Sequence, residues 1–156
     1  MSIITSTSNE KIKHVSMIVK NAKARRKEGL FAVEGIRIAS EIPESLLEEC
    51  YVSEGFTDEH DISEVFEYKV TPVVVSSAVF KKMSDTQNPQ GILCVCRKDK
   101  TTVDDFLAKR MSGKLRLLIL EGIQDPGNLG TMIRTARGIR RLRTSMTARL
   151  PSSVTP

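Results

Sequence analysis

Short apolar runs alternate with amphipathic segments between residues 29 and 96, and this alternation leaves few folds open to the chain. Four runs are typical of strands: "GLFAVEG" (29–35), "CYVS" (50–53), "VTPVVV" (70–75) and "GILCVC" (91–96). Helical patterns separate them: one from Ile36 to a stop before Pro43, then "DEHDISEVFEYK" (58–69) and "SSAVFKKMS" (76–84), with Ser76 as N-cap. We therefore predict a compact α/β unit whose sheet is mostly buried.

The segment before this unit predicts an N-terminal helix. "TSNE" (7–10) is a capping box, in which Thr7 caps the helix and Glu10 reaches back to the chain. Apolar residues then recur at helical spacing as far as Ala22. The pattern predicts one amphipathic helix over residues 8–26.

The chain after residue 96 begins with a hydrophilic connector, "RKDKTTVDDFLAKRMSGK" (97–114), which predicts a domain boundary and one helix begun by Thr101 and Asp104. The apolar run "LRLLILE" (115–121) is typical of a central strand, and "LGTMIRTA" (129–136) of a helix. We expect a domain over residues 1–100, a linker over 101–113, a fragment over 114–137 and a disordered basic tail over 138–156.

The charge is unevenly distributed along the chain. The net charge is +5, but six arginines and no acidic residue follow Asp125, which leaves 18 basic and 19 acidic residues up to and including Asp125. The pI therefore reflects the tail and does not by itself indicate nucleic acid. Basic residues crowd the first 37 positions, whereas residues 41–67 hold ten acidic residues and no Lys or Arg. The basic stretch is either a phosphate-binding face or a solvated helix surface.

Cysteines and histidines give no sign of a metal or redox centre. Cys50, Cys94 and Cys96 lack CxxC spacing, and the last two would share one face of a strand, which predicts buried free thiols. His14 and His60 have no ligand constellation near them. No apolar run approaches the roughly 20 residues of a membrane span, and the N-terminus lacks a signal-peptide core. We expect a cytoplasmic protein with no membrane partner.

The stretch "GIQDPGN" (122–128) joins the strand expected at 115–121 to the following helix, at the sheet edge where α/β proteins bind ligands. Asn128 is a candidate N-cap, and free N–H groups at a helix start can hold an anion. Arg134 lies six residues further on, so its side chain could fold back towards the loop or point elsewhere. The plain alternative is a capped helix with Arg134 on its surface.

"EGIQDPGNLGTMIRTA" resembles the first signature of the SpoU (TrmH-like) family of RNA ribose 2′-O-methyltransferases, in which Asn128–Leu129–Gly130 precedes Arg134–Thr135–Ala136. "TSNEKIKH", "GLFAVEGIR" and "SDTQNPQGILCV" resemble that family's substrate-binding domain, so the likeness covers about residues 3–138. The resemblance implies a small ribosomal-protein-like α/β domain that binds rRNA or tRNA. The first strand and helix of a trefoil-knot methyltransferase domain would follow.

The resemblance also implies residue roles. Asn128 and Arg134 would be catalytic, with Arg134 gripping the phosphate beside the target ribose and stabilising negative charge on oxygen. The expected RNA contacts in the small domain are Arg25, Arg26, Lys27, Glu34 and Arg37. S-adenosylmethionine would be the cofactor of the complete family fold, which works as a homodimer.

The sequence departs from the family pattern after about residue 137, where Arg, Ser, Thr and Pro replace an expected apolar strand. The later signatures, which build the knot and the cofactor pocket, are absent from this sequence. We expect a truncated or frameshifted chain that is inactive and does not bind S-adenosylmethionine, and that either self-associates or has no partner copy. The alternatives are a non-catalytic RNA-binding module using residues 1–100 and a stable protein that binds nothing.

Overall fold

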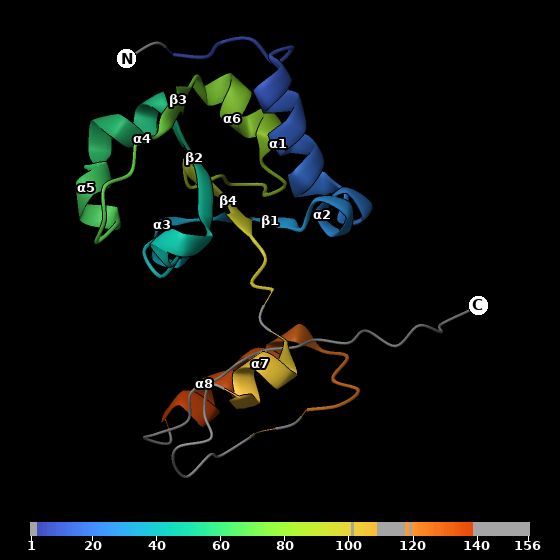
Figure 1. Ribbon diagram of the computed structural model, residues 1–156. Helices are drawn as coiled ribbons and strands as arrows, with labels where there is room; N and C mark the ends of the chain where they lie inside the picture. Colours follow the sequence, from blue (N-terminus) through green and yellow to red (C-terminus); the bar gives the residue numbers. More distant parts are fainter. Residues whose placement is uncertain (1–2, 101, 109–117, 119, 139–156) are drawn as a thin grey trace. The chain divides into compact units, whose positions relative to one another are not determined.

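The computed structural model describes residues 3–100, 102–108, 118 and 120–138. The chain divides into two compact units, Met1–Asp99 and Lys100–Pro156 (Figure 1). Thr101, the predicted cap of the linker helix, lies outside the described residues, as do residues 139–156 of the predicted tail. So do most of the predicted strand 115–121, of which only 118, 120 and 121 are described, none of them in a strand.

The first unit is built on a four-stranded sheet. Strands β1 (Leu30–Glu34), β4 (Ile92–Arg97), β2 (Leu47–Ser53) and β3 (Val73–Val75) lie in the order β1-β4-β2-β3. β4 runs antiparallel to both β1 and β2, while β2 and β3 are parallel. The four predicted strands are therefore all present, and β4 lies centrally between β1 and β2 (Figure 1).

Helices cover both faces of this sheet (Figure 1). One core cluster joins the sheet to α1 (Glu10–Lys20), α2 (Ala22–Glu28) and α6 (Ser77–Met83). The other joins it to α3 (Ile36–Ala39), α4 (Glu54–Glu59) and α5 (Ile62–Val65). Central strand β4 contributes Leu93 and Val95 to the first cluster and Ile92, Cys94 and Cys96 to the second, as a period of two requires. The predicted buried α/β sheet is confirmed.

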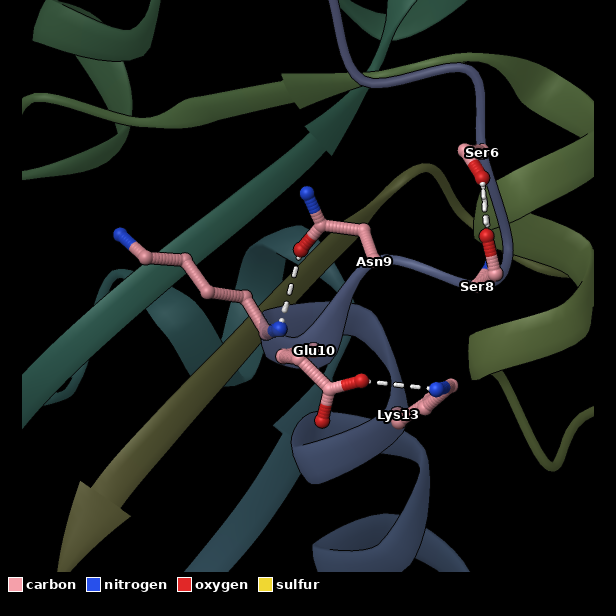
Figure 2. A network of polar contacts seen from close by, with 6 residues as sticks. Ser6, Ser8, Asn9, Glu10 and Lys13 are labelled. Atoms are coloured by element: carbon pink, nitrogen blue, oxygen red, sulfur yellow. Dashed lines mark hydrogen bonds and ion pairs between the residues drawn. The ribbon is translucent and has the colours of Figure 1, made fainter.

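The N-terminal helix differs from the prediction at both ends. Asn9, not Thr7, caps α1: its side-chain oxygen accepts the Lys11 N–H at 2.9 Å, and Glu10 pairs with Lys13 at 2.7 Å (Figure 2). The predicted helix 8–26 is broken at Asn21, which ends α1 and whose side chain caps α2. Asn forms such caps readily, so one residue turns the chain between two short helices.

The two edges of the sheet differ. Ile4 forms a parallel bridge to Val75 on β3, with hydrogen bonds of 3.0 Å on both sides of Ile4. No described strand pairs with the outer edge of β1. Two hydrogen bonds, from Lys98 N–H to Gly29 C=O and from Gly35 N–H to Ile92 C=O, show which β1 residues direct their main-chain groups towards β4. Because such pairs alternate, the main-chain groups of Leu30, Ala32 and Glu34 point outwards.

Two helices are described in the second unit, α7 (Val103–Ala108) and α8 (Pro126–Gly138). At the start of α7, Thr102 and Asp105 form reciprocal bonds, one residue later than the predicted pair. Helix α8 begins earlier and ends later than the predicted helix 129–136. None of the helices among the described residues is long and apolar enough to cross a membrane.

Candidate functional site

The Glu34 carboxylate, at the end of β1, holds a loop that lies 50 to 56 residues further along the chain. Ser84 Oγ donates to Oε2 at 2.7 Å, while Thr86 Oγ1 and the Gln90 N–H donate to Oε1 at 2.9 and 3.1 Å. Ser84 is buried and also accepts the Thr86 N–H at 3.0 Å. A carboxylate with three donors fixes the loop 84–90 beside the end of β1.

Two glycines allow this close approach. Gly35 has φ 108°, and a Cβ there would lie 2.7 Å from Gln90 Oε1. Gly91 has φ 79°, and a Cβ there would lie 2.8 Å from Ser53 Oγ and 3.0 Å from Phe56 Cβ. Positive φ favours glycine at both positions, and at Gly91 the contact with Phe56 Cβ also leaves no space for a side chain.

Arg25 ties α2 to the end of α1. Its Nη1 donates to the carbonyls of Ile18 and Val19 at 3.0 and 2.7 Å, and the side chain is half-buried. These carbonyls belong to the last turn of α1, where helix carbonyls need outside partners and a cation is favoured. The predicted RNA contact Arg25 therefore has a structural task as well.

A groove of about 340 Å³ lies along β1, between α2 and the loop held by Glu34. Its lining includes Arg25 of α2, Asp85 and Thr86 of the loop, and the β1 residues Phe31–Glu34. Asp85 is exposed, and its carboxylate has no hydrogen-bond partner among the described residues. The sequence alone does not reveal this groove, because nothing local links residues 85–90 to Glu34.

The other predicted RNA contacts are exposed. Arg26 and Lys27 lie on α2, which precedes β1, and Arg37 lies on α3, which follows it. The structure thus places positive charge at both ends of the strand that lines the groove. Of the five predicted residues, Arg25 and Glu34 line the groove, and the other three do not.

The start of α8 is capped by Asp125 rather than by Asn128. Asp125 Oδ1 accepts the Gly127 N–H at 2.9 Å and Oδ2 accepts the Asn128 N–H at 3.2 Å. Pro126 takes the first helical position, where its missing N–H costs nothing. The prediction of Asn128 as N-cap was wrong, although the Asp–Pro pair in the sequence signals this start. Asn128 is exposed within the first turn of α8.

Arg134 folds back along α8 towards the loop. Its Nη2 donates to Thr131 Oγ1 at 3.1 Å, and Nη1 lies 3.3 Å from the position of a Cβ on Gly130. Thr131 Oγ1 in turn donates to the Gly127 carbonyl at 2.9 Å. The guanidinium therefore lies one turn closer to Asn128 than its Cα, yet the two side chains do not hydrogen-bond to each other. Both are exposed.

The cysteines offer no nucleophile. Cys50, Cys94 and Cys96 are buried free thiols, as predicted. The hydrogen bond to Cys50, together with burial, raises the pKa of the Cys94 thiol, and burial raises the pKa of Cys96 to about 12. Because the thiolate is the reactive form, both thiols are inert near neutral pH. Within the described part of the chain, no three His, Cys, Asp or Glu side chains are arranged to hold a metal.

Comparison with known families decides the identity of the first unit. The MRM3-like substrate binding domain family matches residues 9–94, more than half of the chain. The chain belongs to the SpoU (TrmH-like) family. The match covers α1 through the first half of β4, so the family's substrate-binding domain lies within the three-layer first unit.

Relatives in the SpoU family extend the likeness into the second unit. The chain is 31% identical to the 23S rRNA (guanosine(2553)-2′-O)-methyltransferase RlmP of Bacillus subtilis, covering 87% of this chain and 50% of that protein. It matches a crystal structure of an RNA 2′-O ribose methyltransferase at 28% identity and a TM-score of 0.58, covering 88% and 52% of the two chains. An AdoMet-bound rRNA methyltransferase from Sinorhizobium meliloti, 19% identical, shares the fold, with a TM-score of 0.54 and coverage of 88% and 51%. The chain spans about half the length of these relatives.

SpoU-family relatives bind S-adenosylmethionine, and a ligand of this size needs a concave pocket that encloses most of its surface. Ala136 is the one buried residue among those of the second unit whose side chains are described. The loop residues 120–125 are exposed except for half-buried Ile123. The described residues of the second unit therefore do not enclose such a cofactor.

Proposed function

We propose that this chain supplies the RNA-binding part, and the first catalytic residues, of an S-adenosylmethionine-dependent rRNA or tRNA ribose 2′-O-methyltransferase. The observation that carries the proposal is the match of a substrate-binding family to residues 9–94, the same residues that form the three-layer unit. The methyltransferase names and structures of the relatives support the reaction class.

In this proposal the exposed Arg26, Lys27 and Arg37 contact RNA phosphates, while Arg25 and Glu34 hold the surface in shape. Flexible cations that are not engaged elsewhere can neutralise phosphates and release counterions. Arg25 and Glu34 are already bound to main-chain carbonyls and to the loop 84–90. The Glu34 carboxylate and the Nη1 group of Arg25 therefore position the surface.

The roles proposed for Asn128 and Arg134 follow from their chemistry. Arginine stays protonated at all physiological pH values, so Arg134 is not a general base. It would grip the phosphate beside the target ribose and stabilise negative charge that develops on the 2′-oxygen. Gly130 and Thr131 support its folded-back position. Asn128 presents an exposed amide at the same end of α8.

RNA binding tests the proposal directly. Affinity of the full chain for a fluorescent rRNA fragment is measured across a salt series, for the wild type and for the triple variant Arg26→Ala, Lys27→Ala, Arg37→Ala. Each lost phosphate contact should flatten the slope of log affinity against log salt by roughly 0.7 to 0.9. The control variant Lys69→Ala, Lys81→Ala, Lys82→Ala removes the same charge from positions elsewhere in the unit. Equal slopes for the two triple variants would contradict the proposed contacts.

A non-catalytic RNA-binding module remains the second candidate. The family match to residues 9–94 supports it as well, because that match lies wholly within the first unit. Isothermal titration with S-adenosylmethionine separates the two candidates. Saturable micromolar binding by the full chain supports the enzyme, and absence of binding together with retained RNA affinity supports the module.

A further inference from the structure

The groove along β1 combines an open sheet edge with charged side chains of both signs. The outward main-chain N–H and C=O groups of Ala32 have no partner strand among the described elements. Arg25 uses Nη1 for the two carbonyls of α1, which leaves the donors on Nε and Nη2. Asp85 offers a carboxylate with no hydrogen-bond partner among the described residues. Arg25, Ala32 and Asp85 thus bring hydrogen-bond donors and acceptors to the lining of one groove.

The groove has the size and lining of a site for one flat polar group. Its volume is about 340 Å³, at the lower end of the range for small-ligand pockets. Val19, Phe31 and Leu93 supply apolar lining, against which a planar ring can pack. The exposed cations Arg26 and Lys27 lie on the adjoining helix α2, where a phosphate backbone leading to the ring would be held.

We propose that this groove binds an unpaired guanine base of the RNA, an inference that rests on the proposed function. Guanine presents two N–H donors on its Watson–Crick edge and acceptors at O6 and N7. The Asp85 carboxylate accepts from the donor edge, and the Arg25 guanidinium or the Ala32 N–H donates to the acceptors. Adenine and uracil lack two adjacent N–H donors that one carboxylate can accept together. Single-stranded segments can turn such a base out of the stack.

Glu34 is the positioning residue of this site. Its bonds to Ser84, Thr86 and Gln90 fix the backbone on either side of Asp85, so the carboxylate of Asp85 is presented from a rigid loop. Because Asp85 itself is exposed and makes no bond among the described residues, its replacement leaves this network in place. Asp85 is therefore the residue that tests the site without disturbing the fold.

The experiment measures fluorescence anisotropy of the full chain with labelled RNA hexamers: oligouridine with one central guanosine, the same hexamer with inosine or adenosine at that position, and oligouridine alone. We expect the guanosine hexamer to bind about tenfold more tightly than the other three. Inosine lacks the exocyclic amine of guanine, so the difference between the guanosine and inosine hexamers measures the contribution of that one donor. Asp85→Asn should abolish the preference for guanosine, whereas the control Asp58→Asn, at an exposed position of α4, should keep it. Unchanged melting temperatures show that both variants fold.

The outcomes separate the two proposals. If the chain binds no hexamer and no rRNA fragment, the proposed function fails, and the guanine site fails with it. If it binds all hexamers equally, or if Asp85→Asn keeps the guanosine preference, RNA binding stands and the guanine site is overturned. Concentration-dependent amide protection at Ala32 without RNA would show that the edge takes a strand of a second copy, which also overturns the site.

Discussion

Replacing Gly91 with alanine tests how tightly the loop junction is packed. Gly91 has φ 79°, and a Cβ would meet Ser53 Oγ at 2.8 Å and Phe56 Cβ at 3.0 Å. A positive φ costs an alanine roughly 1–2 kcal/mol, and overpacking in a buried site typically costs about 1–3 kcal/mol. The reduced entropy of the unfolded chain offsets about 0.4–1 kcal/mol. We therefore expect the free energy of unfolding to fall by about 2–4 kcal/mol.

Two other glycines separate the strain from the steric contacts. Gly29, after α2, has φ 67° and nothing within 4 Å of the position that a Cβ would take, so Gly29→Ala should lose only about 1 kcal/mol. Gly55 lies exposed in α4 with a helical backbone and open space around it, so Gly55→Ala should gain about 0.5–1 kcal/mol.

Urea denaturation followed by far-UV circular dichroism gives the three free-energy changes, and thermal melts give an independent ranking. One kcal/mol corresponds to about 4–8 °C in a domain of this size, so Gly91→Ala should melt roughly 10 °C or more below wild type. The Ser53 side chain also caps α4 through the Phe56 N–H, so amide exchange at Phe56 should accelerate in this variant. If Gly91→Ala costs no more than Gly29→Ala, the packing described at this junction is wrong.

Three further outcomes follow from local contacts. Asp125→Ala removes the cap of α8, so hydrogen exchange at the Gly127 and Asn128 amides should speed up by an amount equivalent to about 1 kcal/mol. Hydrogen exchange at the start of α6, which the distant Ser76 caps, should not change. Native protein should resist alkylation by iodoacetamide at pH 8, because burial suppresses the thiolate of Cys96, and urea-unfolded protein should react fully. The unfolded chain loses the Cys96 proton near pH 9 but the folded chain only near 12. The free energy of unfolding should therefore fall between these values by at most about 1.4 kcal/mol per pH unit, and Cys96→Ala should flatten that decline.

The sequence predicted the sheet because each strand corresponds to a short apolar run of its own. Alternation in "GILCVC" fixed which residues of β4 face each layer, and Ser76 was correctly predicted as the cap of α6. The N-terminal capping residue was misassigned because Thr7 and Asn9 are equally plausible caps two positions apart. Within the predicted helix 58–69 only the last two residues of α4 and the short α5 are helical, and Phe66 packs into the core from an extended backbone.

The candidate site was less predictable than the fold. The apolar pattern placed Arg134 on a helix and Asn128 at its cap, and the family assignment from the resemblance is confirmed. The roles of the two residues stay predictions. The binding of Glu34 to the loop 84–90 could not be foreseen, because its donors are 50 or more residues away and become neighbours only when β4 pairs with β1. Arg25 likewise appears as one more surface cation until the break at Asn21 turns it back onto α1.

The contrast between the two sheet edges limits how copies of this unit can join. A sheet with one open edge can accept a single added strand, after which pairing stops. Ile4 closes the β3 edge through its bridge to Val75. Loss of that short N-terminal segment would leave β1 and β3 both open, so each copy could pass strand pairing on to the next in an unending line. The bridge at Ile4 would therefore limit strand pairing between copies to the open β1 edge.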